Sequence, residues 1–182
     1  MSYLVSPLSE VLSKYPEEQV SQILSSFSCE RDKDVESFLR DKAIVQEKKQ
    51  TSRTYLIFDD DTNLLVAYFA LAISIMEDKN LKCSNRMQRK MNFNNNVALS
   101  YLIGPLGKRD GSAKGLGMFA IEKAISCILK ANEKVGCRVI RIDCRESLIE
   151  YYENNGFTPV GCNAEGNLNL MVRIIETDAV AA

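Results

Sequence analysis

The stretch GKRDGSAKGLGMFAIEKAI, residues 107–125, decides the fold, because it joins a strand-like segment to an amphipathic helix through a run of glycines. Gly111, Gly115 and Gly117 crowd the point at which the helix begins. Glycine in such a place allows a sharp turn or a close approach of the backbone to a ligand. Unpaired amides and the helix dipole favour an anion there. We therefore predict that this segment holds a phosphate group.

The segments on either side predict one mixed α/β domain. Hydrophobic patterning favours strands over residues 54–58, 64–75, 97–103, 137–144, 157–161 and 167–175, with a short extended segment near 23–29. Helices are expected as one or two short pieces within 6–26, then over 32–50 with Asp34 as cap, 118–132 and 146–155. The long apolar strand 64–75 is expected at the centre of the sheet, paired in a hairpin with the strand before it.

Composition limits the class of protein. The 182 residues are 46% hydrophobic and 26% charged, which is typical of a globular protein with a real core. With 23 basic and 24 acidic residues the net charge is −1, so there is no global case for binding nucleic acid or a membrane. Neither a signal peptide nor a membrane span is expected. The six cysteines form no CxxC pair, which favours free thiols and a cytoplasmic location.

The chain contains no histidine. This removes Ser-His-Asp hydrolysis, Cys-His proteolysis and HExxH metal sites, and we expect no catalytic metal. Any general acid or base must come from Asp, Glu, Tyr, Lys, Cys, a chain terminus or water.

Three phosphate-binding patterns compete for the glycine segment. A Walker A loop would require glycine at Ser112, so it fails. A dinucleotide fingerprint fits residues 115–120 as GxGxxA, with Asp143 as the ribose acid at the end of the next strand. About a dozen residues separate the strand end expected at Ile103 from Gly115, whereas the dinucleotide turn is tight, and no further βαβ unit follows Asp143. The dinucleotide interpretation is therefore less favoured but stays open.

The third pattern is carried by two motifs in order. A glycine loop opening a helix, a strand, and a short helix bearing YYENNGF (residues 151–157) resemble the GNAT family of acyl-CoA N-acyltransferases. The family pattern Gln/Arg-x-x-Gly-x-Gly/Ala maps onto SAKGLG, with Ser112 in place of Gln or Arg. The contact of that residue would be missing or supplied by Lys108, Arg109 or Lys114. The likeness covers residues 26–175, and its early part resembles a subgroup that includes bacterial toxins acetylating aminoacyl-tRNA.

The resemblance implies a GNAT-like α/β (mixed α+β) domain over residues 26–182, with a central, mostly antiparallel sheet, a splayed parallel pair and flanking helices. Residues 1–25 would form a helical extension. Acetyl-CoA is the implied co-substrate, with its pyrophosphate on backbone amides near the helix start and its pantetheine arm beside residues 102–104. The implied cofactor-binding residues are Leu102, Ile103, Gly104, Lys108, Arg109, Ser112, Ala113, Lys114, Gly115, Leu116, Gly117 and Met118. The implied catalytic residue is Tyr152, which would protonate the departing thiolate.

The implied reaction is direct transfer of an acetyl group to a primary amine in a ternary complex. A carboxylate acting through water is the candidate base, and Glu77 and Asp78 are supported by placement alone. The acceptor is left open among a small amine, a protein amine and aminoacyl-tRNA. The basic stretch 76–96 is either solvated surface or a contact with a phosphate-bearing substrate. A homodimer is left open, and the alternative function is a non-enzymatic sensor of acyl-CoA or NAD.

Overall fold

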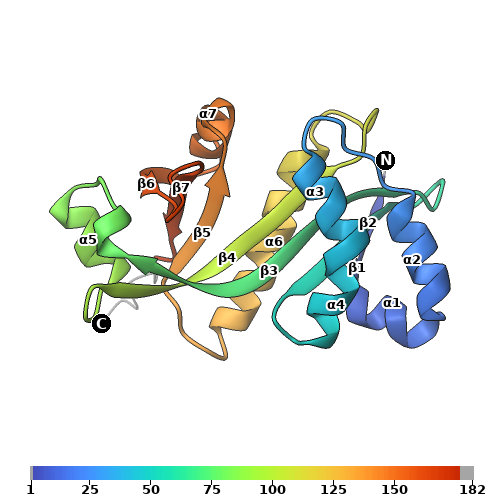
Figure 1. Cartoon of the computed structure of the whole chain (residues 1–182), viewed down its shortest axis with the longest axis horizontal. Helices are drawn as coiled ribbons and strands as arrows, with labels where there is room; N and C mark the ends of the chain where they lie inside the picture. The colour runs from blue at the N-terminus through green and yellow to red at the C-terminus, as the bar shows by residue number, and fades with distance from the viewer. Residues whose placement is uncertain (1, 177–182) are drawn as a thin grey trace. The chain divides into compact units, whose positions relative to one another are not determined.

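The computed structural model describes residues 2–176 and contains one seven-stranded mixed sheet flanked by helices (Figure 1). The strand order is β1-β2-β3-β4-β5-β7-β6. Strands β4 and β5 form the parallel pair and the other neighbours are antiparallel, which confirms the expected fold class. The strands are β1 (Tyr3–Pro7), β2 (Arg53–Asp59), β3 (Leu65–Glu77), β4 (Val97–Lys108), β5 (Val139–Cys144), β6 (Thr158–Cys162) and β7 (Asn169–Ile174).

The expected helices occur in the expected order, with one irregularity, and one further helix, α5, lies in the basic stretch 76–96, where none was included in the expected order. They are α1 (Leu8–Lys14), α2 (Glu17–Ser25), α3 (Lys33–Ser37), α4 (Ala43–Lys48), α5 (Asn85–Met91), α6 (Leu116–Asn132) and α7 (Ile149–Glu153). A π-helical turn, Phe38–Lys42, separates α3 from α4 within the helix that was expected to be continuous. Single-turn 3₁₀ segments, Asp78–Asn80 and Glu146–Leu148, precede α5 and α7.

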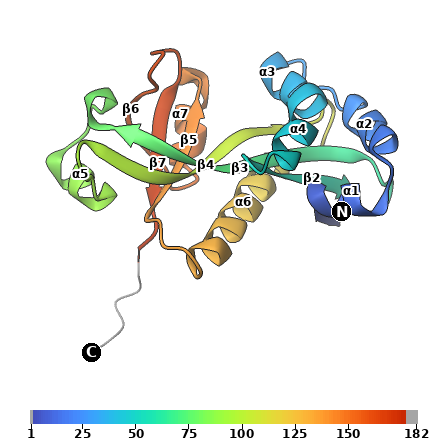
Figure 2. The same ribbon diagram turned by 60° about the horizontal axis from the view of Figure 1, so that its bottom comes forward.

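The chain divides into two compact units, and the first comprises the residues up to Ala72 together with Gly104–Ser126. Its centre is the first half of β3, where residues 67–70 are buried on both faces as expected, whereas Ile73 and Ile75 further along the strand are exposed. Figure 2 shows α3 and α4 on one face of β3 and α6 on the other. On the α3 side, Tyr68 packs edge-on against Phe27 at 5.4 Å between ring centroids and parallel to Phe38 at 6.3 Å.

The first residues of the chain differ most from expectation. Residues 3–7 form strand β1, which pairs antiparallel with β2 from Tyr3↔Asp59 to Pro7↔Tyr55 and was not predicted. The extended segment expected near 23–29 is wrong, because its first residues complete α2. Helices α1 and α2 bury side chains in the core of the first unit, among them Leu8, Val20 and Leu24. The domain boundary expected at residue 25 stays a prediction.

The second unit comprises Ile73–Ile103 and the residues from Cys127 onwards. Its parallel pair is short, from Tyr101↔Ile140 to Ile103↔Ile142, and β5 then pairs antiparallel with β7 along its whole length. Met76, Val139 and Val172 belong to its core, with Met87 from α5 packed against them. The expected hairpin of β6 and β7 is confirmed.

Gly161 of β6 allows residues 80–82, just before α5, to pack closely against the β6 backbone. An added Cβ there would lie 2.1 Å from the carbonyl oxygen of Asn80, and the N–H of Lys82 donates to the carbonyl of Val160 at 2.6 Å. Since neither backbone can yield easily, we expect Gly161→Ala to lower the free energy of unfolding by about 1–3 kcal/mol, measured by urea denaturation. Gly136→Ala is the control, because its Cβ would meet no atom within 4 Å. Equal losses in the two variants would contradict the prediction.

Candidate functional site

Strand β4 does not end at Ile103 but continues through Gly107 to Lys108. An ideal Cβ at Gly107 would lie 2.3 Å from Cγ1 of Val35 on α3, so a larger residue here would force the Val35 side chain to move. Glycine here serves packing and does not break the strand. The predicted strand end is therefore wrong, and the approach to Gly115 is shorter than expected.

One of the two arguments against the dinucleotide alternative is thereby weakened, because the spacing between the strand and the glycines is less unusual than expected. The other argument holds. After β5 the described chain contains only short α7 and the antiparallel β6–β7 hairpin, whereas a dinucleotide fold continues with further βαβ units. Sheet topology, rather than loop length, disfavours that alternative.

The turn between β4 and α6 is fastened to β3 at the carbonyl oxygen of Val66. The backbone N–H of Arg109 donates to this oxygen at 2.7 Å, and the hydroxyl of Ser112 donates to it at 3.3 Å. Nζ of Lys108 donates to the carbonyl of Ser112 at 3.4 Å, from inside the same turn. Ser112, where the GNAT pattern has Gln or Arg, thus stabilises the conformation of the loop.

Two glycines in this turn have left-handed backbone conformations, with φ of +74° at Gly111 and +87° at Gly115. A Cβ at either position would meet no atom within 4 Å, so the backbone there faces open space. Helix α6 begins at Leu116, and the N–H of Phe119 is the first to donate to Gly115, at 3.0 Å. The preceding amides are those that a helix start leaves for an anion.

The side chain of Arg109 supplies a further observation. Its Nη1 atom is buried and has no hydrogen-bond partner among residues 2–176. Leaving a buried cationic N–H unpaired is costly, because the group has lost water without gaining an acceptor. A bound anion would supply both the acceptor and the opposite charge. The open amides at the start of α6 fit an anion such as a pyrophosphate, and Arg109, in the same turn, is a candidate for a further donor.

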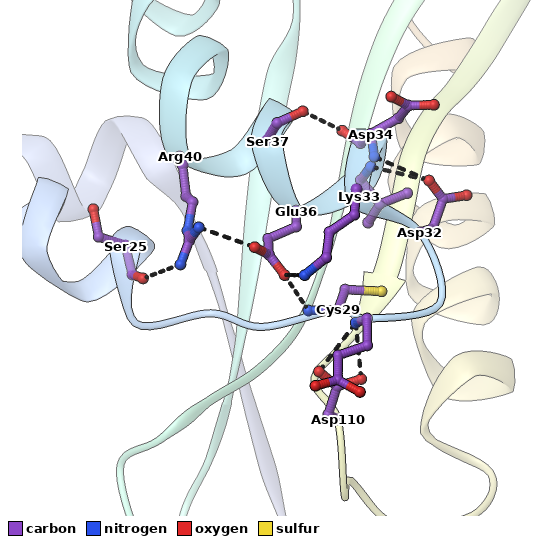
Figure 3. Close-up of polar contacts among 11 residues, drawn as sticks. Ser25, Cys29, Asp32, Lys33, Asp34, Glu36, Ser37, Arg40 and Asp110 are labelled. Atoms are coloured by element: carbon purple, nitrogen blue, oxygen red, sulfur yellow. Dashed lines mark hydrogen bonds and ion pairs between the residues drawn. The ribbon is translucent and has the colours of Figure 1, made fainter.

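Asp110 ties the turn to the loop that precedes α3 (Figure 3). Both oxygens of its carboxylate accept the backbone N–H of Glu30 at 3.1 Å, and its own N–H donates to the carbonyl of Ser28 at 3.1 Å. These contacts fix Asp110, which follows Arg109 in the turn, to the loop before α3. The turn is thus fixed at two points of the first unit before any ligand binds.

The loop that receives Asp110 is itself held by the buried carboxylate of Glu36 (Figure 3). Glu36 accepts the backbone N–H of Cys29 at 2.8 Å, Nζ of Lys33 at 3.1 Å and Nη1 of Arg40 at 2.9 Å. Asp32, rather than the expected Asp34, caps α3, since its side chain accepts two backbone N–H groups of the first turn. The backbone N–H of Cys29, then Lys33, lowers the pKa of Glu36 below its usual value of 4.5.

Tyr152 lies in the second unit, on the last turn of α7, and is 6% exposed. Its ring packs edge-on against Tyr151 at 5.3 Å and against Phe157 at 6.0 Å. The carbonyl of Tyr152 accepts the N–H of Phe157 at 3.1 Å across the turn made by Gly156, whose φ is +82°. The YYENNGF motif therefore forms a compact helix end around the tyrosine.

The other expected site residues fall in both units. Leu102 and Ile103 belong to the part of β4 in the second unit, whereas the residues from Gly104 to Met118 belong to the first. Lys114 is exposed and Ala113 is half-buried in the turn. The assignment of these residues and of Tyr152 to acetyl-CoA stays a prediction.

Other reactive groups give no competing site. Burial raises the pKa of the Cys144 thiol to about 11, so it is not a nucleophile near neutral pH. Glu77, considered as a base, is ion-paired with Lys79 at 2.9 Å. Residues 2–176 contain no group of three or more side chains suited to a metal ion. No helix in that range is long and apolar enough to cross a bilayer.

The Glu36 contacts predict a pH dependence of stability. Because the folded-state pKa is lowered, the carboxylate stabilises the fold above about pH 4.5, and this contribution is lost as the pH falls through the lower folded-state value. We expect Glu36→Gln to be less stable than the wild type at pH 7, with the difference shrinking towards pH 3, in urea denaturation series. Glu18→Gln, at an exposed position on α2, is the control. A pH-independent difference would contradict this account.

Comparison with known proteins adds to this geometry. No protein-family model matches the chain, and no curated protein sequence matches it. Solved structures do. A tyrosine-to-phenylalanine mutant of KacT superposes with a TM-score of 0.75 at 19% identity, covering 96% of this chain and 95% of that one. AtaT complexed with acetyl-methionyl-tRNAfMet gives 0.71 at 19% identity, covering 92% and 94%.

A structure described as a bacterial toxin is equally similar, with a TM-score of 0.75 at 15% identity and coverage of 96% and 91%. At these identities the likeness establishes the fold. The chain therefore has the fold of KacT and AtaT, and this confirms the GNAT-like fold class that its two motifs implied.

Proposed function

We propose that this chain is an acetyl-CoA-dependent N-acetyltransferase whose acceptor is the α-amino group of aminoacyl-tRNA. The observation that carries the proposal is the turn before α6, with its open glycine backbone at a helix start and the unpaired buried nitrogen of Arg109. Complexes of the similar proteins support it, since AtaTR is bound with AcCoA and AtaT is complexed with acetyl-methionyl-tRNAfMet.

In this proposal the first unit binds the pyrophosphate. Backbone N–H groups between Ala113 and Met118 donate to its oxygens, and Arg109 adds a charge-assisted hydrogen bond. The backbone of residues 102–104 lies along the pantetheine arm. The hydroxyl of Ser112 is already used on Val66 and keeps the loop in its binding conformation.

The chemistry then needs one proton donor. The neutral amine nitrogen attacks the thioester carbonyl carbon and gives up one proton to water as the amide forms, the carbon–sulfur bond breaks, and sulfur leaves with the bonding electrons. Tyr152 donates its phenolic proton to that sulfur and recovers a proton from solvent. A phenol keeps its proton at neutral pH and can therefore donate it to the sulfur as the carbon–sulfur bond breaks. Mutants of KacT and AtaT in which a tyrosine is replaced by phenylalanine are among the similar structures.

The absence of histidine favours an α-amine as the acceptor. A lysine amine has a pKa near 10.4 and needs a base at neutral pH, whereas α-amines have pKa values of about 7.7–8.0 and are partly neutral there. A site with no assigned base therefore suits an aminoacyl ester better than a protein lysine. We also infer a protein partner by analogy with AtaT, because a mutant of AtaT is found bound to the C-terminus of the antitoxin AtaR.

Replacing Tyr152 tests the chemistry. We expect Tyr152→Phe to lower kcat roughly a hundredfold or more, because the leaving thiolate loses its proton donor. The affinity for acetyl-CoA should stay unchanged, measured by calorimetry alongside thiol release with aminoacyl-tRNA as acceptor. Tyr151→Phe, which changes the neighbouring ring on the same helix, is the control. Wild-type turnover in Tyr152→Phe would remove this residue from the mechanism.

Replacing Arg109 tests the cofactor. Loss of a hydrogen bond to a charged group should raise the Kd for acetyl-CoA in Arg109→Ala roughly ten- to hundredfold in titration calorimetry. Arg31→Ala, which removes an exposed arginine of the same unit, should bind as the wild type does. Thermal stabilisation of the wild type by NAD and not by acetyl-CoA would overturn the proposed function. Binding of acetyl-CoA without transfer to any amine would instead indicate a sensor.

A further inference from the structure

Helix α5 is amphipathic, with apolar side chains towards the core and basic side chains on its exposed side. Met87 and Met91 pack into the core of the second unit. Arg86 and Arg89 are exposed and, three residues apart, share one side of the helix. Lys82, also exposed, lies in the chain between the end of β3 and the start of α5. We call Lys82, Arg86 and Arg89 the α5 basic face.

The charge of this face is not balanced by its surroundings. No acidic residue occurs in the sequence between Asp78 and Asp110. Lys90, the remaining cation of α5, is paired with Glu176 at 3.2 Å. Within the described chain no carboxylate forms an ion pair with the α5 basic face. The net charge of −1 for the whole chain therefore hides a local patch of three unpaired cations.

A hollow of about 540 Å³ opens where α5 ends. This volume lies within the range of roughly 300–1,000 Å³ that holds small ligands in proteins. Met91, the last residue of α5, and Asn92 line its edge, so the hollow continues from the helix. It lies entirely within the second unit.

The lining combines an apolar surface with polar groups. Val97 and Leu99 supply apolar area, and Leu99 is 60% exposed. Oδ1 of Asn132 accepts the N–H of Cys137 at 2.8 Å, which leaves its NH₂ group as a donor. Arg138 lines the same hollow and is exposed. An unstacked nucleotide matches this set, because it has flat apolar faces, hydrogen-bonding edges and an anionic phosphate.

The hollow and the tyrosine of α7 flank opposite ends of β5. Arg138 immediately precedes this strand, whereas Tyr152 follows it on α7. Six residues of strand span about 17 Å at 3.3 Å per residue. The hollow is therefore no part of a site built around Tyr152, and an acceptor that uses both must be long. An RNA meets that requirement, whereas a small amine does not.

We propose that the α5 basic face binds the phosphate backbone of the RNA acceptor and that the adjoining hollow receives one of its unstacked nucleotides. The proposal rests on the proposed function for the identity of the acceptor. It adds where the body of the RNA is held, away from the reacting amine. These contacts contribute equally to ground state and transition state, so they affect KM and leave kcat unchanged.

The charge is tested with Arg86→Ala/Arg89→Ala and deacylated tRNA. Removal of two phosphate contacts should weaken binding about tenfold at 0.1 M salt and reduce the slope of log K against log salt by roughly 1.5. Lys42→Ala/Lys49→Ala, which removes two exposed lysines of the first unit, is the charge-matched control. Thermal unfolding of each variant checks that the fold is kept. Equal affinity and slope in the two double variants would overturn the proposal.

The hollow is tested with Leu99→Trp, which fills it without changing charge. We expect weaker tRNA binding with an unchanged salt slope. Ile73→Trp, at a similarly exposed position 62% accessible, is the control. Wild-type binding by Leu99→Trp would remove the nucleotide from the hollow. Equal binding of duplex DNA through the α5 basic face would overturn the assignment to RNA.

Transfer assays separate this surface from the proposed function. Acetylation of aminoacyl-tRNA with a wild-type KM in Arg86→Ala/Arg89→Ala would overturn the surface and leave the function intact. RNA binding that depends on α5, in a wild-type chain that transfers no acetyl group to aminoacyl-tRNA, would support the surface and contradict the function. A raised KM with unchanged kcat supports both.

Discussion

The close approach of β4 to α3 at Gly107 is the constraint on which the turn before α6 depends. With only 2.3 Å between an ideal Cβ and Cγ1 of Val35, a side chain at this position would force Val35 out of its present packing against the sheet. The hydroxyl of Tyr68 donates to the carbonyl of Val35 at 2.5 Å, so the same turn of α3 is also held from β3. Because α3 packs close to the sheet, the loop before it contacts Asp110. The turn before α6 is therefore held both by this loop and by β3.

The fixed turn matters because anion binding by backbone amides requires preorganisation. A flexible glycine loop would lose conformational entropy on binding, at about 1–2 kcal/mol for each residue ordered. Here Asp110 and the two donors to Val66 order the turn in advance. Glu36 then stabilises the supporting loop through three charged or backbone donors. In the proposed function, a buried carboxylate on α3 would therefore support phosphate binding through the backbone and without touching a ligand.

Much of this fold follows from local patterns, and the exceptions share a cause. The helix after Gly115, the hairpin of β2 and β3 and the helix end at Gly156 were predicted, because apolar periodicity and glycine position are local signals. Strand β1 was missed because its five residues have no clear alternation and its stability comes from pairing with a strand some fifty residues away. The continuation of β4 was missed because a glycine demanded by Val35 looks in the sequence like a strand breaker.

The candidate site shows the same division. The glycine spacing predicted a phosphate-binding turn and the GNAT resemblance implied Tyr152, yet neither gave a means of choosing among Lys108, Arg109 and Lys114 as the missing cation. Burial separates them, since Lys114 is exposed, Lys108 donates to the carbonyl of Ser112, and only Arg109 has a buried nitrogen without a partner in the described chain. A serine suits position 112 of the motif, because its short hydroxyl side chain reaches the carbonyl of Val66 and holds the loop. Loop anchoring and positive charge, which one long polar side chain could combine, are here divided between Ser112 and Arg109. In the proposed function, this division would allow the turn to bind a phosphate with Ser112 in place of the Gln or Arg of the GNAT pattern.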